Sequence, residues 1–127
     1  MLVIRRGGRA RLPGYWAPLS GTIEAGESQE QALVREIREE VGLDATPLAK
    51  VWESISSDGG FVLHWWEAAA GPGAPVLAPG EVSEARWVTV EEFLRLEPIF
   101  DGDRAFFERA LATTDAPADT PAGPLKR

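Results

Sequence analysis

The sequence of 127 residues lacks cysteine entirely and contains a single histidine, His64. Without thiols the chain can form no disulfide, no thiolate zinc site and no cysteine nucleophile. One histidine also excludes a multi-histidine metal site and disfavours a histidine-based catalytic triad. The ionisable groups left for chemistry are carboxylates, because Asp and Glu number 20 against 13 Lys and Arg.

Long apolar runs and an excess of positive charge are also missing. The opening segment MLVIRR has too few apolar residues for a signal peptide, and prolines and glycines interrupt the weakly polar stretch at residues 68–80. The net charge of −7 argues against a nucleic acid polymer or an anionic membrane as partner, since both attract basic surfaces. We therefore expect a cytoplasmic protein that acts on a small molecule, and a phosphorylated substrate would need a divalent cation beside it.

Length and composition are those of one globular domain. Hydrophobic residues make up 44% and charged residues 26% of the chain, which excludes a mainly disordered protein. A chain of this length buries enough surface for one core. We predict a single domain over residues 1–112 and a disordered C-terminal tail over residues 113–127, which are rich in Pro, Thr and Ala.

Hydrophobic patterning predicts a mixed α/β order of elements. Ser28 with Gln31, and Thr89 with Glu92, have the spacing of a capping box at the start of a helix. A turn at residues 57–60 favours a β-hairpin. Strands are expected near residues 2–4, 51–56, 61–67 and 86–89, and helices at residues 28–41, 89–96 and 104–112.

The first of these helices, which Gly42 is suited to end, carries carboxylates beside an apolar stripe. At about 100° per residue, Glu36, Glu39 and Glu40 share an arc roughly 100° wide. This arc adjoins the apolar positions, so the carboxylates are expected at the margin of the core. Their hard oxygens suit Mg²⁺ or Mn²⁺. On the helix alone, however, a solvated charged face is the commoner interpretation. The apolar stripe consists of Leu33, Val34, Ile37 and Val41.

The wider segment at residues 21–43, GTIEAGESQEQALVREIREEVGL, favours the metal site. It resembles the signature of the Nudix hydrolases, the MutT-type pyrophosphohydrolases, which is G-x5-E-x7-R-E-U-x-E-E-x-G-U with U a bulky apolar residue. The flanking residues Trp16, Pro18 and 85–88 also resemble the family. The resemblance implies a Nudix-type α/β/α sandwich with a mixed β-sheet. All nine specified positions are matched, by Gly21, Glu27, Arg35, Glu36, Ile37, Glu39, Glu40, Gly42 and Leu43.

The resemblance implies a set of metal ligands. Glu36 and Glu40 would be the main ligands, and Glu39 would bind a second ion directly or through water. The backbone carbonyl of Ser20 would be a further ligand. The implied cofactor is Mg²⁺, with Mn²⁺ as an alternative, and the number of ions stays open.

Three further residues would orient this site. Arg35 and Glu27 would pair and hold the loop before the helix against the carboxylates, and Gly21 would begin that loop. A ligand cluster works only if the residues around it fix its geometry.

The implied reaction is hydrolysis of the pyrophosphate bond of a nucleoside diphosphate linked to another group X. An NTP, an NDP-sugar, ADP-ribose or a dinucleoside polyphosphate would qualify. The general base would be a glutamate of the signature, with Glu39 the first candidate and Glu36 beside it. Alternatively it would be Glu81 or Glu84, on the loop before the strand at residues 86–89.

Substrate contacts are expected from basic and aromatic residues near the N-terminus. Arg5, Arg6 or Arg11 is suited to hold a terminal phosphate, and Trp16 to stack on a base. Trp52, Trp65 and Trp66 are further aromatic candidates for stacking. Of these, Trp65 shares a strand face with apolar residues and is expected in the core, and His64 is expected to be packed or on the surface rather than a base.

Two other functions are alternatives to hydrolysis. A non-catalytic Nudix-like module that binds a nucleotide or metabolite would have no reason to keep a crowded carboxylate cluster. An isomerase of prenyl diphosphates on the same scaffold would use a cysteine, which this chain lacks. A homodimer is compatible with the sequence, which does not decide the oligomeric state.

Overall fold

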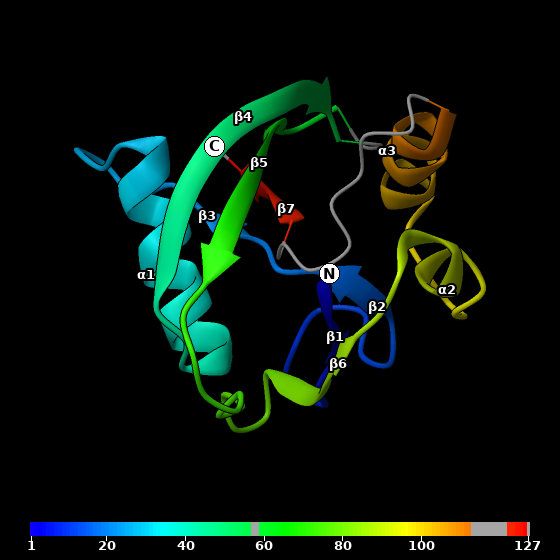
Figure 1. Cartoon of the computed structure of the whole chain (residues 1–127), viewed down its shortest axis with the longest axis horizontal. Helices are drawn as coiled ribbons and strands as arrows, with labels where there is room; N and C mark the ends of the chain where they lie inside the picture. Colours follow the sequence, from blue (N-terminus) through cyan, green and yellow to red (C-terminus); the bar gives the residue numbers. More distant parts are fainter. Residues whose placement is uncertain (57–58, 113–121, 127) are drawn as a thin grey trace.

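The described part of the chain combines β-strands with three helices (Figure 1). This computed structural model describes residues 1–56, 59–112 and 122–126, the last of these by their backbone. The elements are β1 (Leu2–Arg6), β2 (Trp16–Pro18), β3 (Gly21–Thr22), α1 (Gln29–Val41), β4 (Ala45–Ile55), β5 (Val62–Ala70), β6 (Val82–Trp87), α2 (Val90–Leu94), α3 (Asp101–Ala112) and β7 (Ala122–Lys126).

The strands form two sheets. The first has the order β2-β1-β6 and is antiparallel throughout, with Leu2 opposite Trp87 and Val3 opposite Pro18. The second has the order β3-β7-β5-β4, and its β3–β7 pair is parallel whereas the others are antiparallel. The expectation of a mixed β-sheet is therefore confirmed.

Helices cover both sides of the sheets, because alternate residues of each strand face opposite ways. On β1, Leu2 and Ile4 belong to the core cluster under α1, and Val3 belongs to the cluster under α2 and α3. Figure 1 shows α1 on one side of the molecule and α2 with α3 on the other. The α/β/α arrangement is confirmed. The α1 cluster includes Leu33, Ile37 and Val41, and the other cluster includes Trp65, Phe93, Phe106 and Phe107.

Several elements are longer than their patterns predict. Strand β4 begins at Ala45 rather than at residue 51, and it contains Pro47. Proline is tolerated because β4 is an edge strand, so that its outer N–H groups need no partner. Register shifts after Pro47 and Lys50 interrupt the alternation that would have marked this segment as a strand. Helix α3 likewise starts at Asp101 instead of residue 104.

The hairpin and the tail are only partly described. Strands β4 and β5 pair as a hairpin, and Ser56 donates its N–H to the carbonyl of Phe61 across 2.9 Å. Ser57 and Asp58 of the expected turn lie outside the described residues. So do residues 113–121 and 127 of the expected tail, where disorder stays a prediction. Residues 122–126 of that segment form β7, a strand that the sequence analysis did not anticipate.

The C-terminal end of α1 is joined to the loop at residues 71–80. Val76 donates its N–H to the carbonyl of Val41 across 2.7 Å, and Ala78 donates to the carbonyl of Glu40 across 3.0 Å. These bonds satisfy two of the carbonyls that a helix end leaves without partners. None of the helices within the described ranges is long and apolar enough to cross a membrane.

Candidate functional site

The helix that carries the carboxylates is capped at both ends. The Ser28 hydroxyl accepts the N–H of Gln31 across 3.1 Å, and the Gln31 side chain accepts the N–H of Ser28 across 2.9 Å. At the other end Gly42 adopts φ 66°, the left-handed conformation that favours glycine, and donates its N–H to Arg38. Both predicted caps are confirmed, so the start and end of α1 follow from the local sequence.

Gly21 makes room for the side chain of Glu36. A Cβ atom on Gly21 would lie 2.0 Å from Cδ of Glu36, so no larger residue fits unless Glu36 moves. The N–H of the next residue, Thr22, donates to the Glu36 carboxylate. Burial raises the pKa of Glu36, and the hydrogen bond from Arg35 opposes that rise. The first residue of the signature thus sets the position of one predicted ligand.

Arg35 joins the loop before the helix to the helix itself. Its Nε and Nη2 donate to the two oxygens of Glu27 across 2.7 and 2.9 Å, and Nη2 also donates to the carbonyl of Thr22 across 2.8 Å. The Arg35 guanidinium holds the pKa of Glu27 at about 2, with the N–H of Glu24 as the next cause. The two residues therefore form the pair that the resemblance implies.

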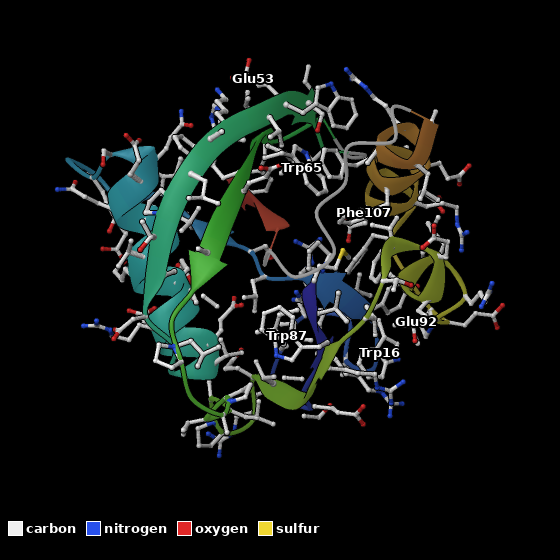
Figure 2. All side chains as sticks on the ribbon, in the orientation of Figure 1. Trp16, Glu53, Trp65, Trp87, Glu92 and Phe107 are labelled. Atoms are coloured by element: carbon white, nitrogen blue, oxygen red, sulfur yellow. The ribbon has the colours of Figure 1, made fainter. Side chains whose placement is uncertain are left out.

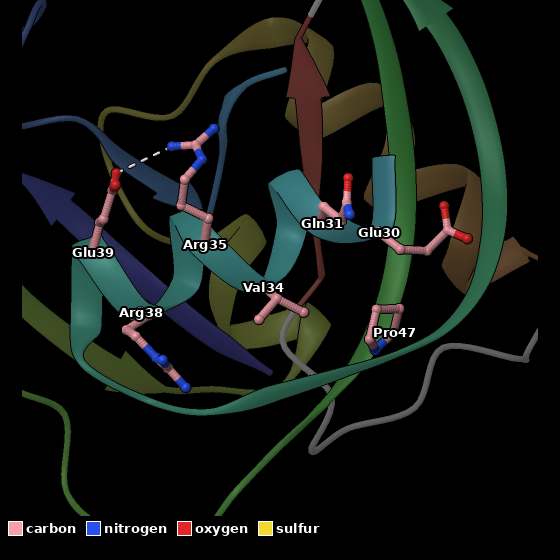
Figure 3. Close-up of a pocket in the computed structure, with 7 residues that line it drawn as sticks. All are labelled: Glu30, Gln31, Val34, Arg35, Arg38, Glu39 and Pro47. Atoms are coloured by element: carbon pink, nitrogen blue, oxygen red, sulfur yellow. Dashed lines mark hydrogen bonds and ion pairs between the residues drawn. The ribbon is translucent and has the colours of Figure 1, made fainter. Parts of the chain in front are cut away.

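The remaining nitrogen of Arg35 contacts the carboxylates of the helix. Nη1 donates to Glu36 across 2.8 Å and to Glu39 across 3.2 Å, and it lies 3.6 Å from Oε1 of Glu24. Figure 3 shows the contact between Arg35 and Glu39. One guanidinium thus contacts four carboxylates with a single positive charge, and a cation on the same oxygens of Glu36 and Glu39 would compete with Nη1 for them.

Glu40 is the most deeply buried carboxylate of the helix. Burial raises its pKa to about 8, the charge of Glu36 adds to the rise, and the N–H of Ser20 opposes it by donating to the carboxylate. Its Oε2 atom is enclosed and has no hydrogen-bond partner in the described part of the chain. A buried oxygen without a partner is costly unless a proton or a cation satisfies it.

This donor set fits a divalent cation. Glu40 supplies an enclosed oxygen with no other partner, Glu36 lies beside it, and Ser20 contacts Glu40 from the preceding loop. Hard carboxylate and carbonyl oxygens are the ligands that Mg²⁺ prefers. Among the described residues, no three acidic or histidine side chains are grouped closely enough to hold a metal ion as they stand. As they stand, the side chains nearest to a cation site are the two carboxylates of Glu36 and Glu40.

The hollow drawn in Figure 3 lies on another side of α1. Arg35 and Glu39 line it, but Glu36 and Glu40 do not. Val34 and Pro47 give it an apolar lining between the helix and β4. We therefore place the candidate site at the loop side of the helix rather than in this hollow.

The two distal base candidates differ in where they lie. Ala85 packs against the α1 cluster, so its neighbour Glu84 faces the opposite side of the sheet, where it pairs with Arg86 across 2.6 Å. Glu81 donates its N–H to the carbonyl of Ala78, on the loop that bonds to the end of α1. Of the two candidates, Glu81 lies on the segment that is docked beside the site.

The residues predicted to contact the substrate lie on different sides of the sheet. Arg6 lies on the α1 side of the sheet, where its charge lowers the pKa of Glu40, and its guanidinium lies 5.8 Å from the centre of the Phe100 ring. Arg5 faces the other side and donates to the carbonyl of Gly14 across 3.4 Å. Trp16 is only 6% exposed, and the guanidinium of Arg86 lies over it, 4.7 Å from the centre of the Trp16 ring. Its ring therefore has no open face for a base in this structure.

Two residues that contact the site, Glu24 and Thr22, were missed by the sequence analysis. Glu24 lies near Nη1 of Arg35 and donates its N–H to Glu27 across 3.1 Å, and the carbonyl of Thr22 accepts from Arg35. The spacing of three residues between Glu24 and Glu27 is the one signal that could have indicated the first contact. A backbone carbonyl leaves no signal in the sequence.

Comparison with known proteins identifies the family. The family model described as the NUDIX domain matches residues 1–110. The CTP pyrophosphohydrolase of Escherichia coli is 34% identical over 126 residues, which cover 94% of this chain and 88% of that protein. The NAD-capped RNA hydrolase NudC of Deinococcus radiodurans is 34% identical over 110 residues, which cover 84% of this chain but 38% of NudC.

Two solved structures have a fold similar to that of this chain. The MutT protein from Methanosarcina mazei aligns with a TM-score of 0.69 at 22% identity, over 91% of this chain and 85% of that one. The E. coli ORF135 protein aligns with a TM-score of 0.64 at 28% identity, over 93% and 84% of the two chains. The chain belongs to the Nudix family. It spans 29% to 38% of the length of the NudC proteins that it matches.

Proposed function

We propose that this chain is a Mg²⁺-dependent Nudix pyrophosphohydrolase that cleaves the pyrophosphate bond of a nucleoside diphosphate linked to a further group. The observation that carries the proposal is the enclosed Oε2 of Glu40, which has no partner in the described ranges and lies beside Glu36. The complete signature around these residues supports it, because Arg35 and Glu27 fix the loop that faces them.

Each residue of the cluster has a separate task. Glu36 and Glu40 hold the cation, together with the carbonyl of Ser20. The bound ions supply charge neutralisation for the diphosphate and activation of the attacking water. Arg35 keeps its two bonds to Glu27 and releases Nη1, so the loop stays in place while the carboxylates rearrange. Arg6, on the same side of the sheet as Glu40, holds a phosphate of the substrate.

The general base is Glu39 in this proposal. Its side chain is 60% exposed, the most open of the three helix carboxylates, and Arg35 is its only partner in the described part of the chain. Glu81 is the alternative because its loop is bonded to the end of α1. Replacing each by glutamine separates them. The true base lowers kcat by about 10²–10⁴-fold, and the other residue leaves kcat nearly unchanged.

Nucleoside triphosphates are the first substrate class to test. The relative named CTP pyrophosphohydrolase aligns over most of both chains, whereas the relative named NAD-capped RNA hydrolase aligns over part of its length. NDP-sugars, ADP-ribose and dinucleoside polyphosphates complete the panel, with and without Mg²⁺. We expect turnover of at least one member that stops when a chelator removes the metal.

Two variants test the carboxylates directly. Glu36→Gln and Glu40→Gln each remove a charge from the cation site without changing side-chain size, so we expect turnover to fall at least about 10²-fold while circular dichroism stays unchanged. Glu108→Gln, on α3, is the matched control and keeps full turnover. Nucleotide binding without metal-dependent turnover across the whole panel would indicate a binding module and would refute the proposed hydrolase.

A further inference from the structure

The hollow beside α1 that lies apart from the candidate site has a volume of about 590 Å³. Its walls are two rows of α1 side chains, and Pro47 of β4 lies at its edge (Figure 3). Side chains four residues apart form a ridge along a helix, and a second helix packs into the groove between two such ridges. The hollow therefore has the form of a helix-packing site. The first row is Glu30, Val34 and Arg38, and the second is Gln31, Arg35 and Glu39.

The middle and the edge of the hollow are apolar. Val34 is half-buried against the α1 core cluster, and Pro47 faces the same hollow from β4. The next residue on this edge strand, Leu48, is 57% exposed at the first of its two register shifts. Apolar side chains that are exposed together mark contact surfaces more often than isolated ones do. These three residues give a second chain something to pack against.

The first row has opposite charges at its two ends. Glu30 lies in the first turn of α1 and Arg38 in the last, with Val34 midway between them (Figure 3). Eight residues of helix separate the two charges by about 12 Å. Glu30 makes no hydrogen bond or ion pair with the described part of the chain. Arg38 pairs with Asp44, but both side chains are largely exposed, so the guanidinium stays accessible from outside.

This arrangement of charges is complementary to itself. When a second copy lies antiparallel on the first, with Val34 against Val34, a two-fold axis passes between the two valines. Glu30 of each copy then lies opposite Arg38 of the other, because the two residues stand four positions from the axis in opposite directions. A two-fold interface consists of such reciprocal contacts. A parallel copy would place like charges against each other, which is unfavourable.

The helix dipole is the other explanation for these charges. It favours an acid in the first turn of α1 and a base in the last, as Glu30 and Arg38 are placed. The dipole accounts for their signs, but a charge on any side of those turns would serve it equally. Both residues instead stand on the one row that borders the hollow, equally far from its apolar middle. A contact across the hollow explains that placement as well.

We propose that this hollow is the contact surface for a second copy of the chain, packed with α1 antiparallel against α1. The proposal goes beyond the proposed function, because neither metal nor substrate takes part in the contact. Glu36 and Glu40 do not line the hollow, so the two cation sites of the dimer stay outside the contact. One helix face with a strand edge is smaller than a stable interface of about 1,200 Å², so the dimer dissociates at about 10–100 μM.

The test measures the oligomeric state by sedimentation velocity, without metal or nucleotide. We expect the wild type to pass from monomer to dimer as its concentration rises through about 10–100 μM. Glu30→Arg and Arg38→Glu each place like charges opposite one another, so each variant alone should associate at least about tenfold more weakly. Mixed in equal amounts, the two variants should form a heterodimer as tight as the wild-type dimer, because every pair across the axis again has opposite signs.

Glu108→Arg is the matched control. It makes the same change in net charge as Glu30→Arg, at an exposed position of α3, and should associate as the wild type does. Figure 2 shows Phe107, the residue before it, on the opposite side of the molecule from α1. The double variant Glu30→Arg/Arg38→Glu should associate with itself again. Thermal melts establish that each variant is folded.

A cysteine variant keeps the test decisive if Arg38→Glu does not fold, since that change also removes the ion pair with Asp44. The chain has no cysteine, so Val34→Cys adds a single thiol on the two-fold axis. Diamide, which takes up two electrons and two protons, should oxidise the thiols of two copies to one disulfide, because they meet within reach of each other. We expect a covalent dimer on a non-reducing gel, and monomer from Glu108→Cys.

Three results would overturn the α1 contact. The first is a wild type that stays monomeric at about 200 μM. The second is a dimer that persists in both Glu30→Arg and Arg38→Glu, since the association then lies elsewhere on the molecule. The third is a Val34→Cys protein that cross-links no faster than Glu108→Cys. A dimer with the expected variant pattern but no metal-dependent hydrolysis would refute the proposed hydrolase and support the contact.

Discussion

At the scale of single residues, the site depends on one close approach. Glu36 reaches the space above Gly21 that a side chain would fill, with Cδ only 2.0 Å from the position of a Cβ. The same loop supplies the N–H of Thr22 to Glu36 and the N–H of Ser20 to Glu40. At this position the Glu36 side chain can pack against the backbone because Gly21 has no side chain.

This contact gives a prediction for Gly21→Ala. The added methyl group must displace Glu36, so we expect metal affinity to fall about tenfold or more and turnover to fall with it, because one ligand moves. The loss is measured by titration with Mn²⁺ and by initial rates. Gly102→Ala is the control, since a Cβ there meets nothing within 4 Å and lies in the first turn of α3. Wild-type Mn²⁺ affinity in Gly21→Ala would contradict the prediction.

Contacts between two side chains could be predicted only where the Nudix signature specifies both residues. The pairing of Arg35 with Glu27 follows from the signature, and the structure has it. The contact of the same guanidinium with Glu24 does not, because that residue is unspecified in the pattern. The exposure of Trp87 depends on which side of β6 faces solvent, and this in turn depends on the packing of distant elements.

At the scale of elements, α1 is the helix that carries the site, and α2 is a shorter helix with the same kind of start. Each has a complete capping box, at Ser28 in α1 and at Thr89 in α2. Loss of a cap costs about 1 kcal/mol, because an N–H of the first turn loses its partner. The two caps therefore allow stability and function to be separated.

We predict that Ser28→Ala and Thr89→Ala lower stability by similar amounts but differ in function. Each should reduce the free energy of unfolding by about 1 kcal/mol, measured by urea denaturation. Only Ser28→Ala should weaken Mn²⁺ binding, since fraying of α1 loosens the loop that faces Glu36. Equal effects of both variants on Mn²⁺ affinity would mean that the start of α1 does not position the carboxylates.

Elements with local signals were predictable, and those defined by distant pairing were not. The capping boxes and Gly42 fixed the ends of α1 within a residue. The first half of β4 was missed because Pro47 and two register shifts disguise an edge strand. Strand β7 pairs with β5 and β3, from opposite regions of the chain, and no periodicity in residues 122–126 records those partners.

At the scale of the whole molecule, the acidic site sets how stability depends on pH. Burial raises the pKa of Glu40 from 4.5 to about 8, and burial also raises the pKa of Glu36. Between pH 4.5 and about pH 8, Glu40 keeps a proton in the folded chain that it has released in the unfolded chain. The free energy of unfolding therefore falls as the pH rises. The slope is at most about 1.4 kcal/mol per pH unit for one group.

We predict that in a chelator the melting temperature falls from about pH 5.5 to about pH 8. Glu27 does not obscure this trend. Its pKa is lowered from 4.5 to about 2, so the stability that it contributes is lost only as the pH falls below about 4.5. Added Mg²⁺ needs ionised Glu40, so it should raise stability most near pH 8, by about 2.7 kcal/mol at a hundredfold excess over Kd.

Glu40→Gln provides the control for this prediction. Glutamine cannot ionise, so the variant should show a flatter dependence on pH and a much smaller gain from Mg²⁺. Differential scanning fluorimetry across the pH range measures both effects. A wild-type protein that becomes more stable with rising pH in chelator would show that Glu40 is ionised in the metal-free fold.

The bonds from Val76 and Ala78 to the last carbonyls of α1 have a practical consequence for engineering. A reporter tag or affinity epitope placed after Ala74 would push these two amides away and unravel the helix end that carries Glu40. Gly73 precedes both amides and an added Cβ there meets no neighbour within 4 Å, but its φ of 119° is one that residues with a side chain rarely adopt. The permissive window for such grafts is therefore confined to the front of that loop.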